Sequence, residues 1–227
     1  MTVSTPGTQL RLDLAREPSH RRRDFVNSPG NSEAIATVDT WPTWPGGKLA
    51  LVGPAGSGKT HLARAWAERS GATIVTPNQP DMSQLADVPI LFEDADRFHA
   101  DEFLFHIMNL ADAGRGLLLT GRSPPIAWRI TLPDLRSRLN ALMVVALSPP
   151  DDATLKGVLL KLFTERNIKP PSDVISYLLH RIERSIPTAR DVVARIDEKA
   201  SIEGREITRP LVREVIDEAP PPLDPVD

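Results

Sequence analysis

The chain has 227 residues, enough for one domain and a smaller appended unit, and it has no cysteine, which excludes disulfides, cysteine-ligated metals and a cysteine nucleophile. Its 27 Lys and Arg against 30 Asp and Glu give a net charge of −3, so no overall basic field indicates a nucleic-acid-binding surface. Because it lacks a run of about 18 apolar residues and an N-terminal secretory signal, the sequence predicts a soluble, cytoplasmic protein with no membrane partner.

Residues 1–23 are predicted to form a flexible arm, because proline and glycine interrupt them and helical periodicity is almost absent. One segment of the arm, Gln9-Leu10-Arg11-Leu12-Asp13-Leu14, has a regular pattern. In an extended conformation Leu10, Leu12 and Leu14 lie on one face, since side chains alternate along a strand. Taken alone, this segment is either an edge strand or a peptide that binds a partner.

Residues 24–149 are predicted to form an α/β domain. Short apolar runs predict buried strands at 48–52, 73–76, 90–92, 116–120 and 142–147, and helical periodicity predicts helices at 32–39, 61–70 and 100–113. Strands that alternate with helices are typical of a parallel sheet whose crossover helices cover its faces. The expected fold is therefore α/β, with a five-stranded parallel sheet.

Residues 150–218 are predicted to form a small all-helical domain. The helices are expected at 152–166, 172–184, 187–203 and 210–218. Asp151 or Asp152 is expected to cap the first helix, and Ser172 the second, because short oxygen-bearing side chains bind the free N–H groups of a helix start. The proline-rich segment 219–227 is predicted to be a disordered tail.

The most specific motif lies between the first predicted strand and the next helix. Gly53-Pro54-Ala55-Gly56-Ser57-Gly58-Lys59-Thr60 matches the pattern G-x-x-x-x-G-K-[ST]. Its glycines let backbone N–H groups turn toward phosphate oxygens, and the helix that follows presents its positive end to the same anion. We expect Lys59 to neutralise the β- and γ-phosphates and Thr60 to ligate Mg²⁺. This loop, with His61 after it, predicts a site for ADP or ATP.

A P-loop site also needs a carboxylate at the end of a neighbouring buried strand. Glu93 and Asp94 follow the apolar run Ile90–Phe92, about 34 residues after Lys59. We expect Glu93 to lie beside Mg²⁺ and Asp94 to orient or deprotonate the attacking water. Most proteins of this type carry Asp at the first position, so the longer Glu93 predicts altered metal geometry and weak hydrolysis.

Together these features resemble the AAA+ class of P-loop NTPases, and more closely the bacterial initiator DnaA and its shorter relatives, over about residues 24–218. Asp24-Phe25-Val26 resembles the DnaA segment that packs on adenine, which places Phe25 and Val26 at the nucleotide. Leu132–Leu139 resembles the arginine-finger box. The resemblance therefore implies that Arg138 reaches the γ-phosphate of a neighbouring subunit, with Arg136 as the second candidate. A surface ion pair, with Asp134 as a partner, is the alternative role for Arg138.

The sensor positions depart from the family pattern. Alignment places Pro187 where the family has an arginine at the start of the third lid helix, and Arg184 and Arg190 lie three residues to either side. Arg190 is a candidate to reach a β-phosphate, with Arg184 as the alternative. Arg122 stands at a first-sensor position that is usually acidic or small. The resemblance thus implies a site that holds nucleotide but hydrolyses it poorly.

An arm with the Gln9–Leu14 segment ahead of a DnaA-like core resembles the Hda family, regulators that inactivate DnaA. The segment then resembles a peptide that binds the DNA polymerase III beta sliding clamp, with Gln9 at the mouth of a pocket and Leu12 and Leu14 in apolar recesses. The resemblance implies that the protein docks on the DNA-loaded clamp, reaches DNA only through it, stimulates ATP hydrolysis by DnaA and so inhibits replication initiation. A homo-oligomer is compatible with this role. An autonomous AAA+ ATPase of the helicase-loader type stays open as the alternative.

Overall fold

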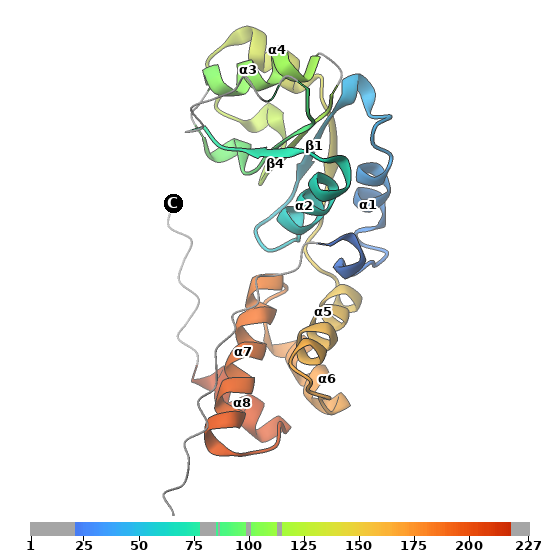
Figure 1. Ribbon diagram of the computed structural model, residues 1–227. Coiled ribbons are helices and arrows are strands. Elements are labelled where there is room, and N and C mark those ends of the chain that lie inside the picture. Colours follow the sequence, from blue (N-terminus) through green and yellow to red (C-terminus); the bar gives the residue numbers. More distant parts are fainter. Residues whose placement is uncertain (1–20, 78–84, 86, 99–100, 113–114, 219–227) are drawn as a thin grey trace, which may run out of the picture.

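The computed structural model describes residues 21–77, 85, 87–98, 101–112 and 115–218 of the chain. The predicted clamp-binding segment Gln9–Leu14 and the predicted tail 219–227 lie outside the described residues. Within the described part, an α/β domain stacks on a helical domain (Figure 1). None of the helices described there combines the length and the hydrophobicity that crossing a bilayer demands.

The α/β domain is built on five strands, which are β1 (Lys48–Val52), β2 (Thr73–Val75), β3 (Ile90–Phe92), β4 (Leu117–Gly121) and β5 (Met143–Ala146). They form one sheet in the order β2-β3-β4-β1-β5, and every neighbouring pair is parallel. This confirms the predicted five-stranded parallel sheet. Since the carboxyl ends of parallel strands share one edge, the segments that follow β1, β3 and β4 converge there.

Helices cover both faces of the sheet (Figure 1). The pair α1 (Ser32–Asp39) and α2 (Lys59–Ser70) packs on one face, and α3 (Asp101–Asp112) and α4 (Pro133–Asn140) pack on the other. Helical periodicity did not indicate α4, because an eight-residue helix with only Leu135 and Leu139 buried carries too few apolar positions to show a period.

The helical domain consists of α5 (Asp152–Glu165), α6 (Ser172–Arg181), α7 (Ile186–Glu203) and α8 (Arg209–Asp217), which enclose a separate apolar core. The carboxylate of Asp151 caps α5 by accepting a hydrogen bond from the Thr154 N–H at 2.7 Å, and the hydrogen bonds from Thr154 lower the pKa of that carboxyl. The predicted cap of α6 was wrong. Pro171 holds the N-cap position, and Ser172 is already the first helical residue.

The N-terminal strap, residues 21–31, joins the two domains (Figure 1). Phe25 is buried in the core of the α/β domain, whereas Val26 packs against the core of the helical domain. The Lys161 ammonium of α5 donates to the Asp24 carbonyl oxygen at 2.7 Å. At the start of the strap, inside the predicted arm, Arg22 pairs with Asp39 at 3.0 Å. The docked chain therefore begins before residue 24.

Candidate nucleotide site

The loop Gly53–Thr60 closes tightly over the carboxyl end of β1. Gly53, Gly56 and Gly58 have positive φ angles of 152°, 74° and 101°. A Cβ atom on Gly53 would lie 2.2 Å from the Leu147 carbonyl oxygen, a separation that no side chain can adopt. These glycines are thus required by the conformation itself, which turns the backbone into a cradle for an anion.

Lys59 begins α2 and is buried within this loop, with 7% of its surface exposed. Its ammonium donates to the carbonyl oxygens of Gly53 at 2.7 Å and Pro54 at 2.8 Å. Burial lowers the pKa of Lys59, and the carboxylates of Asp94 and Asp96 oppose that shift. The loop therefore holds a desolvated cation next to acidic side chains at the sheet edge.

The helical domain contacts the same loop. The backbone N–H of Ile186, at the start of α7, donates to the Gly56 carbonyl oxygen at 3.2 Å. A Cβ atom on Gly56 would lie 2.5 Å from the Ser185 hydroxyl oxygen and 3.2 Å from Cδ of Pro187. Pro187 thus stands beside the loop, where alignment placed the second sensor. The nucleotide site lies at the junction of the two domains.

The strap lies against the other side of the loop. The ring of Phe25 meets the ring of His61 edge to face with 5.2 Å between centroids, and its edge would touch a Cβ atom on Gly58 at 3.3 Å. The structure thus brings Phe25 and His61 together beside the start of α2. Val26 is turned toward the helical domain, where its Cγ1 would lie 2.7 Å from a Cβ atom on Gly157.

Glu93, the carboxylate predicted to lie beside a metal, is engaged by a residue that the sequence did not single out. Arg64 of α2 donates from Nε and from Nη2 to Glu93 Oε2, at 3.1 and 2.9 Å. The other oxygen, Oε1, is buried and accepts no hydrogen bond from the described residues. One signal for this pair was available, because Arg64 follows Thr60 by four residues and so shares its helix face.

The other acidic residues at this edge are held by the end of β4. Asp94 adopts a left-handed backbone conformation with a φ of 51°, and its N–H donates to the Thr120 hydroxyl at 2.9 Å. Asp96 Oδ2 accepts a hydrogen bond from the Arg122 N–H at 2.7 Å. In the described structure, Asp96 Oδ1 and Ser57 Oγ are buried without a hydrogen-bond partner. Backbone strain and orphaned polar atoms concentrate here, as they do at functional sites.

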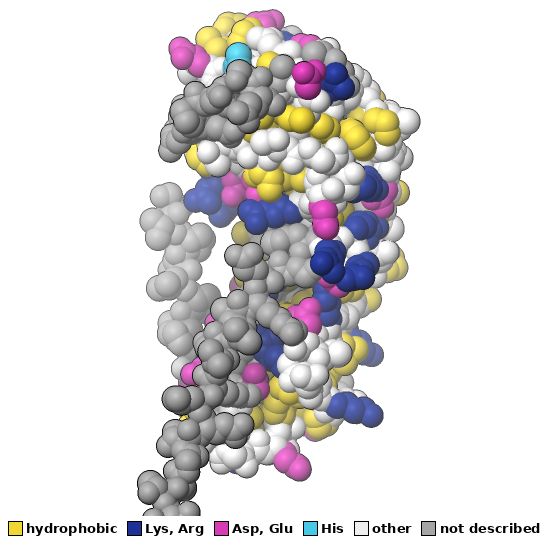
Figure 2. All heavy atoms as spheres, in the orientation of Figure 1, with side chains coloured by type: hydrophobic (Ala, Val, Ile, Leu, Met, Phe, Trp, Pro, Cys, Tyr) yellow, Lys and Arg dark blue, Asp and Glu magenta, His cyan; other side chains and the backbone are white. Residues whose placement is uncertain are grey.

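The residues present fit nucleotide phosphates better than they fit the predicted magnesium site. The glycine cradle and Lys59 suit an anion. Thr60 is exposed, and Glu93 is already paired with Arg64, so this carboxylate is not free to bind a divalent cation. Figure 2 shows Lys and Arg side chains gathered where the two domains meet.

Arg138 lies away from this loop. Its guanidinium donates to Asn109 Oδ1 at 2.6 Å, pairs with Asp112 of α3 and lies 5.5 Å above the Phe105 ring. Asp112 also pairs with Lys48, the first residue of β1. Because the loop follows the opposite end of that strand, roughly 16 Å of strand separate Lys48 from it. Arg138 is therefore not placed to act on a nucleotide in its own site.

The two candidates for the second sensor differ in their surroundings. Arg184 pairs with Asp152 at 2.8 Å. Arg190 is exposed, and no hydrogen bond or ion pair holds it within the described residues. Since Arg190 follows Ile186 by four residues, it lies on the helix face that contacts the loop.

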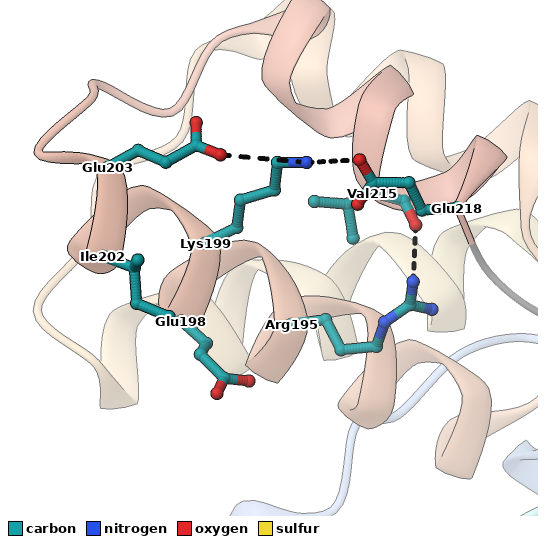
Figure 3. Close-up of a pocket in the computed structure, with 7 residues that line it drawn as sticks. All are labelled: Arg195, Glu198, Lys199, Ile202, Glu203, Val215 and Glu218. Carbon is teal, nitrogen blue, oxygen red and sulfur yellow. Dashed lines mark hydrogen bonds and ion pairs between the residues drawn. The ribbon is translucent and has the colours of Figure 1, made fainter.

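A hollow of about 280 Å³ in the helical domain lies between α7 and α8 (Figure 3). Two cations of its lining are engaged within it, with Lys199 bonded to Glu218 at 2.6 Å and the Arg195 guanidinium donating to the Val215 carbonyl oxygen. None of the residues predicted to bind nucleotide lines it. These contacts link α7 to the end of α8, and the hollow is not part of the nucleotide site.

Residues 152–216 match the family model described as "Hda, lid domain". Domain III of the replication initiation protein DnaA from Thermotoga maritima superposes with a TM-score of 0.75 and 20% identity, over 89% of this chain and 97% of that one. AMPPCP-bound DnaA from Aquifex aeolicus gives a TM-score of 0.68 and 18% identity, over 87% and 70%. The RuvB Holliday junction branch migration motor from Thermotoga maritima gives 0.66 and 14%, over 88% and 72%. These likenesses confirm an AAA+ fold.

Proposed function

Since the chain carries an Hda lid domain on the AAA+ fold of DnaA domain III, and so belongs among the Hda- and DnaA-like AAA+ proteins, we propose that it is a nucleotide-binding regulator of replication initiation. In this proposal it binds ADP or ATP, docks through Gln9–Leu14 on the DNA-loaded sliding clamp, and stimulates ATP hydrolysis by DnaA. Initiation is thereby repressed, and DNA is reached through the clamp.

One observation carries the nucleotide part of this proposal. Three segments that are far apart in the sequence meet at the nucleotide site. They are the glycine loop, the strap with Phe25, and the start of α7 with Ile186. A nucleotide bound there would contact both domains at once. Its binding would therefore fix the helical domain relative to the α/β domain, and the surface offered to a partner would depend on the nucleotide.

The surroundings of Arg138 support a role in trans. Lys48 remains paired with Asp112 when Arg138 leaves. Asp112 is also 48% exposed, and an ion pair at such a surface contributes only about 0–1 kcal/mol. In this proposal the guanidinium gives up the ion pair with Asp112, the hydrogen bond to Asn109 and the contact with the Phe105 ring. It exchanges them for a γ-phosphate held by DnaA, where its fixed fork would spread charge over the transition state.

The helicase-loader alternative is less well supported. An autonomous ATPase needs a metal-activated site of its own, and here Glu93 is paired with Arg64 at 2.9 Å. A protein whose arginine acts on ATP bound to another protein does not need a metal-activated site of its own.

Arg190→Ala is expected to weaken ADP binding by at least about tenfold, because a charge-assisted bond to phosphate contributes roughly 1.5–3 kcal/mol. Titration of a fluorescent ADP analogue measures the affinity. Arg184→Ala is the matched control, since Arg184 lies six residues before Arg190 but pairs with Asp152, and the affinity of this variant should stay within about twofold of wild type. The reverse ranking of the two variants would assign the sensor to Arg184.

The double variant Gln9→Ala, Leu12→Ala is expected to lose retention on immobilised sliding clamp, because it removes both the polar anchor and one apolar contact of the peptide. A pull-down with purified clamp measures this. Thr8→Ala, just outside the segment, should be retained like wild type. Equal retention of the double variant and wild type would contradict docking through this segment and restore the helicase-loader reading.

A further inference from the structure

We propose that the guanidinium of Arg64 replaces a divalent cation at the nucleotide site, so that ADP or ATP binds without Mg²⁺. The inference rests on the proposed nucleotide binding and adds a property to that site. Its basis is the contact of Arg64 with Glu93, in which two nitrogens of one guanidinium bind one carboxylate oxygen at 3.1 and 2.9 Å.

Arg64 projects from the part of α2 that lies next to the phosphate loop. It follows Thr60 by four residues, so both side chains occupy one face of the helix. Thr60 is the hydroxyl that a metal would share with Glu93. A cation attached to this face therefore lies between the loop and the end of β3, the region in which a metal would be held.

The local charge balance explains why a cation is needed there. Burial lowers the pKa of Lys59, and the carboxylates of Asp94 and Asp96 oppose that shift, so acidic groups lie near the phosphate site. A bare Glu93 carboxylate would add to the repulsion of bound phosphates, and in other P-loop proteins the metal offsets such charge. Arg64 supplies a permanent positive charge instead, because a guanidinium does not deprotonate in proteins.

The length of Glu93 fits this arrangement. An aspartate would end one methylene earlier, so the Arg64 bonds of 2.9 and 3.1 Å to Oε2 would lengthen beyond hydrogen-bond range unless the Arg64 side chain or the backbone moved. The Glu93 side chain is only 17% exposed, so its charge needs a partner. Glutamate in place of the usual aspartate thus lets residue 93 form the ion pair with Arg64.

The test compares the affinity for a fluorescent ADP analogue in excess Mg²⁺ with that in excess EDTA. Wild type is expected to change by less than about threefold between the two conditions. Arg64→Gln leaves Glu93 uncompensated, so its affinity in EDTA should fall by at least about tenfold while that in Mg²⁺ falls much less. The double variant Arg64→Gln, Glu93→Gln removes both charges and should again bind without Mg²⁺.

Arg69→Gln is the matched control. Arg69 also lies on α2 and pairs with a carboxylate, Asp39, at 2.8 Å, and its side chain is 40% exposed against 42% for Arg64. Because Arg69 is remote from the loop, its variant should bind in EDTA as wild type does. Circular dichroism melts of all variants verify that each is folded.

A wild-type affinity that falls tenfold or more in EDTA overturns the inference without use of any variant, and leaves nucleotide binding itself intact. Failure of wild type to bind in either condition overturns the proposed nucleotide binding as well. A double variant that remains dependent on Mg²⁺ would also contradict the charge balance between Arg64 and Glu93.

Discussion

Arg138→Ala is expected to abolish the stimulation of ATP hydrolysis on DnaA, lowering the stimulated rate by about 10³-fold, while ADP binding by the variant stays unchanged. An arginine finger supplies charge only at the transition state of the reaction that it reaches in trans. In this chain the residue lies at the amino end of β1, through its shared partner Asp112, and not at its own loop. Loss of the side chain therefore removes catalysis on the partner without disturbing the cradle.

Single-turnover hydrolysis of ATP preloaded on DnaA, with clamp assembled on DNA, measures this effect. Arg136→Ala is the matched control, since Arg136 lies two residues earlier on α4 and donates to the Ile130 carbonyl oxygen at 2.5 Å. It should retain stimulation within a few-fold of wild type. Full stimulation by Arg138→Ala would reject the arginine-finger role. A variant that fails to fold or to bind ADP would show instead that Arg138 has a structural role, holding α4 against α3.

Gly56→Ala is expected to weaken nucleotide binding by about tenfold or more, through strain and overpacking at the junction of the domains. The new Cβ would require the left-handed conformation of Gly56, whose φ is 74°, and would lie 2.5 Å from the Ser185 hydroxyl oxygen. Rotation of the Ser185 hydroxyl relieves the closest contact, but Cβ of Ser185 at 3.1 Å and Cδ of Pro187 at 3.2 Å still press on the new methyl group. This pressure weakens the bond from the Ile186 N–H to the Gly56 carbonyl oxygen. The substitution therefore disturbs both the phosphate loop and the start of α7.

Gly71→Ala is the control that separates the effect of backbone strain from the effect of the contact between the loop and α7. Gly71 ends α2 with a φ of 71°, and a Cβ there would meet no atom within 4 Å. Its substitution should cost about 1 kcal/mol of stability and leave nucleotide affinity unchanged. Thermal unfolding and ADP titration of both variants make the comparison. Equal affinities for the two variants would show that the contact of α7 with the loop does not contribute to nucleotide binding.

Local sequence patterns predicted the elements that local rules govern. The strands ending at Val52 and Phe92 begin and end as expected, and the helix Ser32–Asp39 has the predicted bounds, because apolar runs and caps are short-range signals. Helix α4 escaped notice since two buried leucines do not make a period. At α6, Pro171 occupies the cap position because its extended backbone precedes the helix without any side-chain bond.

Contacts between distant segments could not be predicted from the same patterns. Arg64 and Glu93 are 29 residues apart, and Arg138 and Asp112 are 26 apart. Along the chain, each of these residues has several oppositely charged residues at similar separations, so the sequence does not select one partner. Only the strand order, which places the end of β3 beside α2 and β1 beside the end of α3, selects the partner.

By itself, the sequence determined the phosphate loop and the parallel sheet, since eight contiguous residues and the apolar run of each strand carry that information locally. The tertiary structure decided how charge is balanced around the loop. It paired Glu93 with Arg64, laid the strap and α7 against the cradle, and held Arg138 at the far end of β1. Long side chains take their partners from whatever the fold brings within hydrogen-bond reach, and that distance is set by packing between elements, not by spacing along the chain.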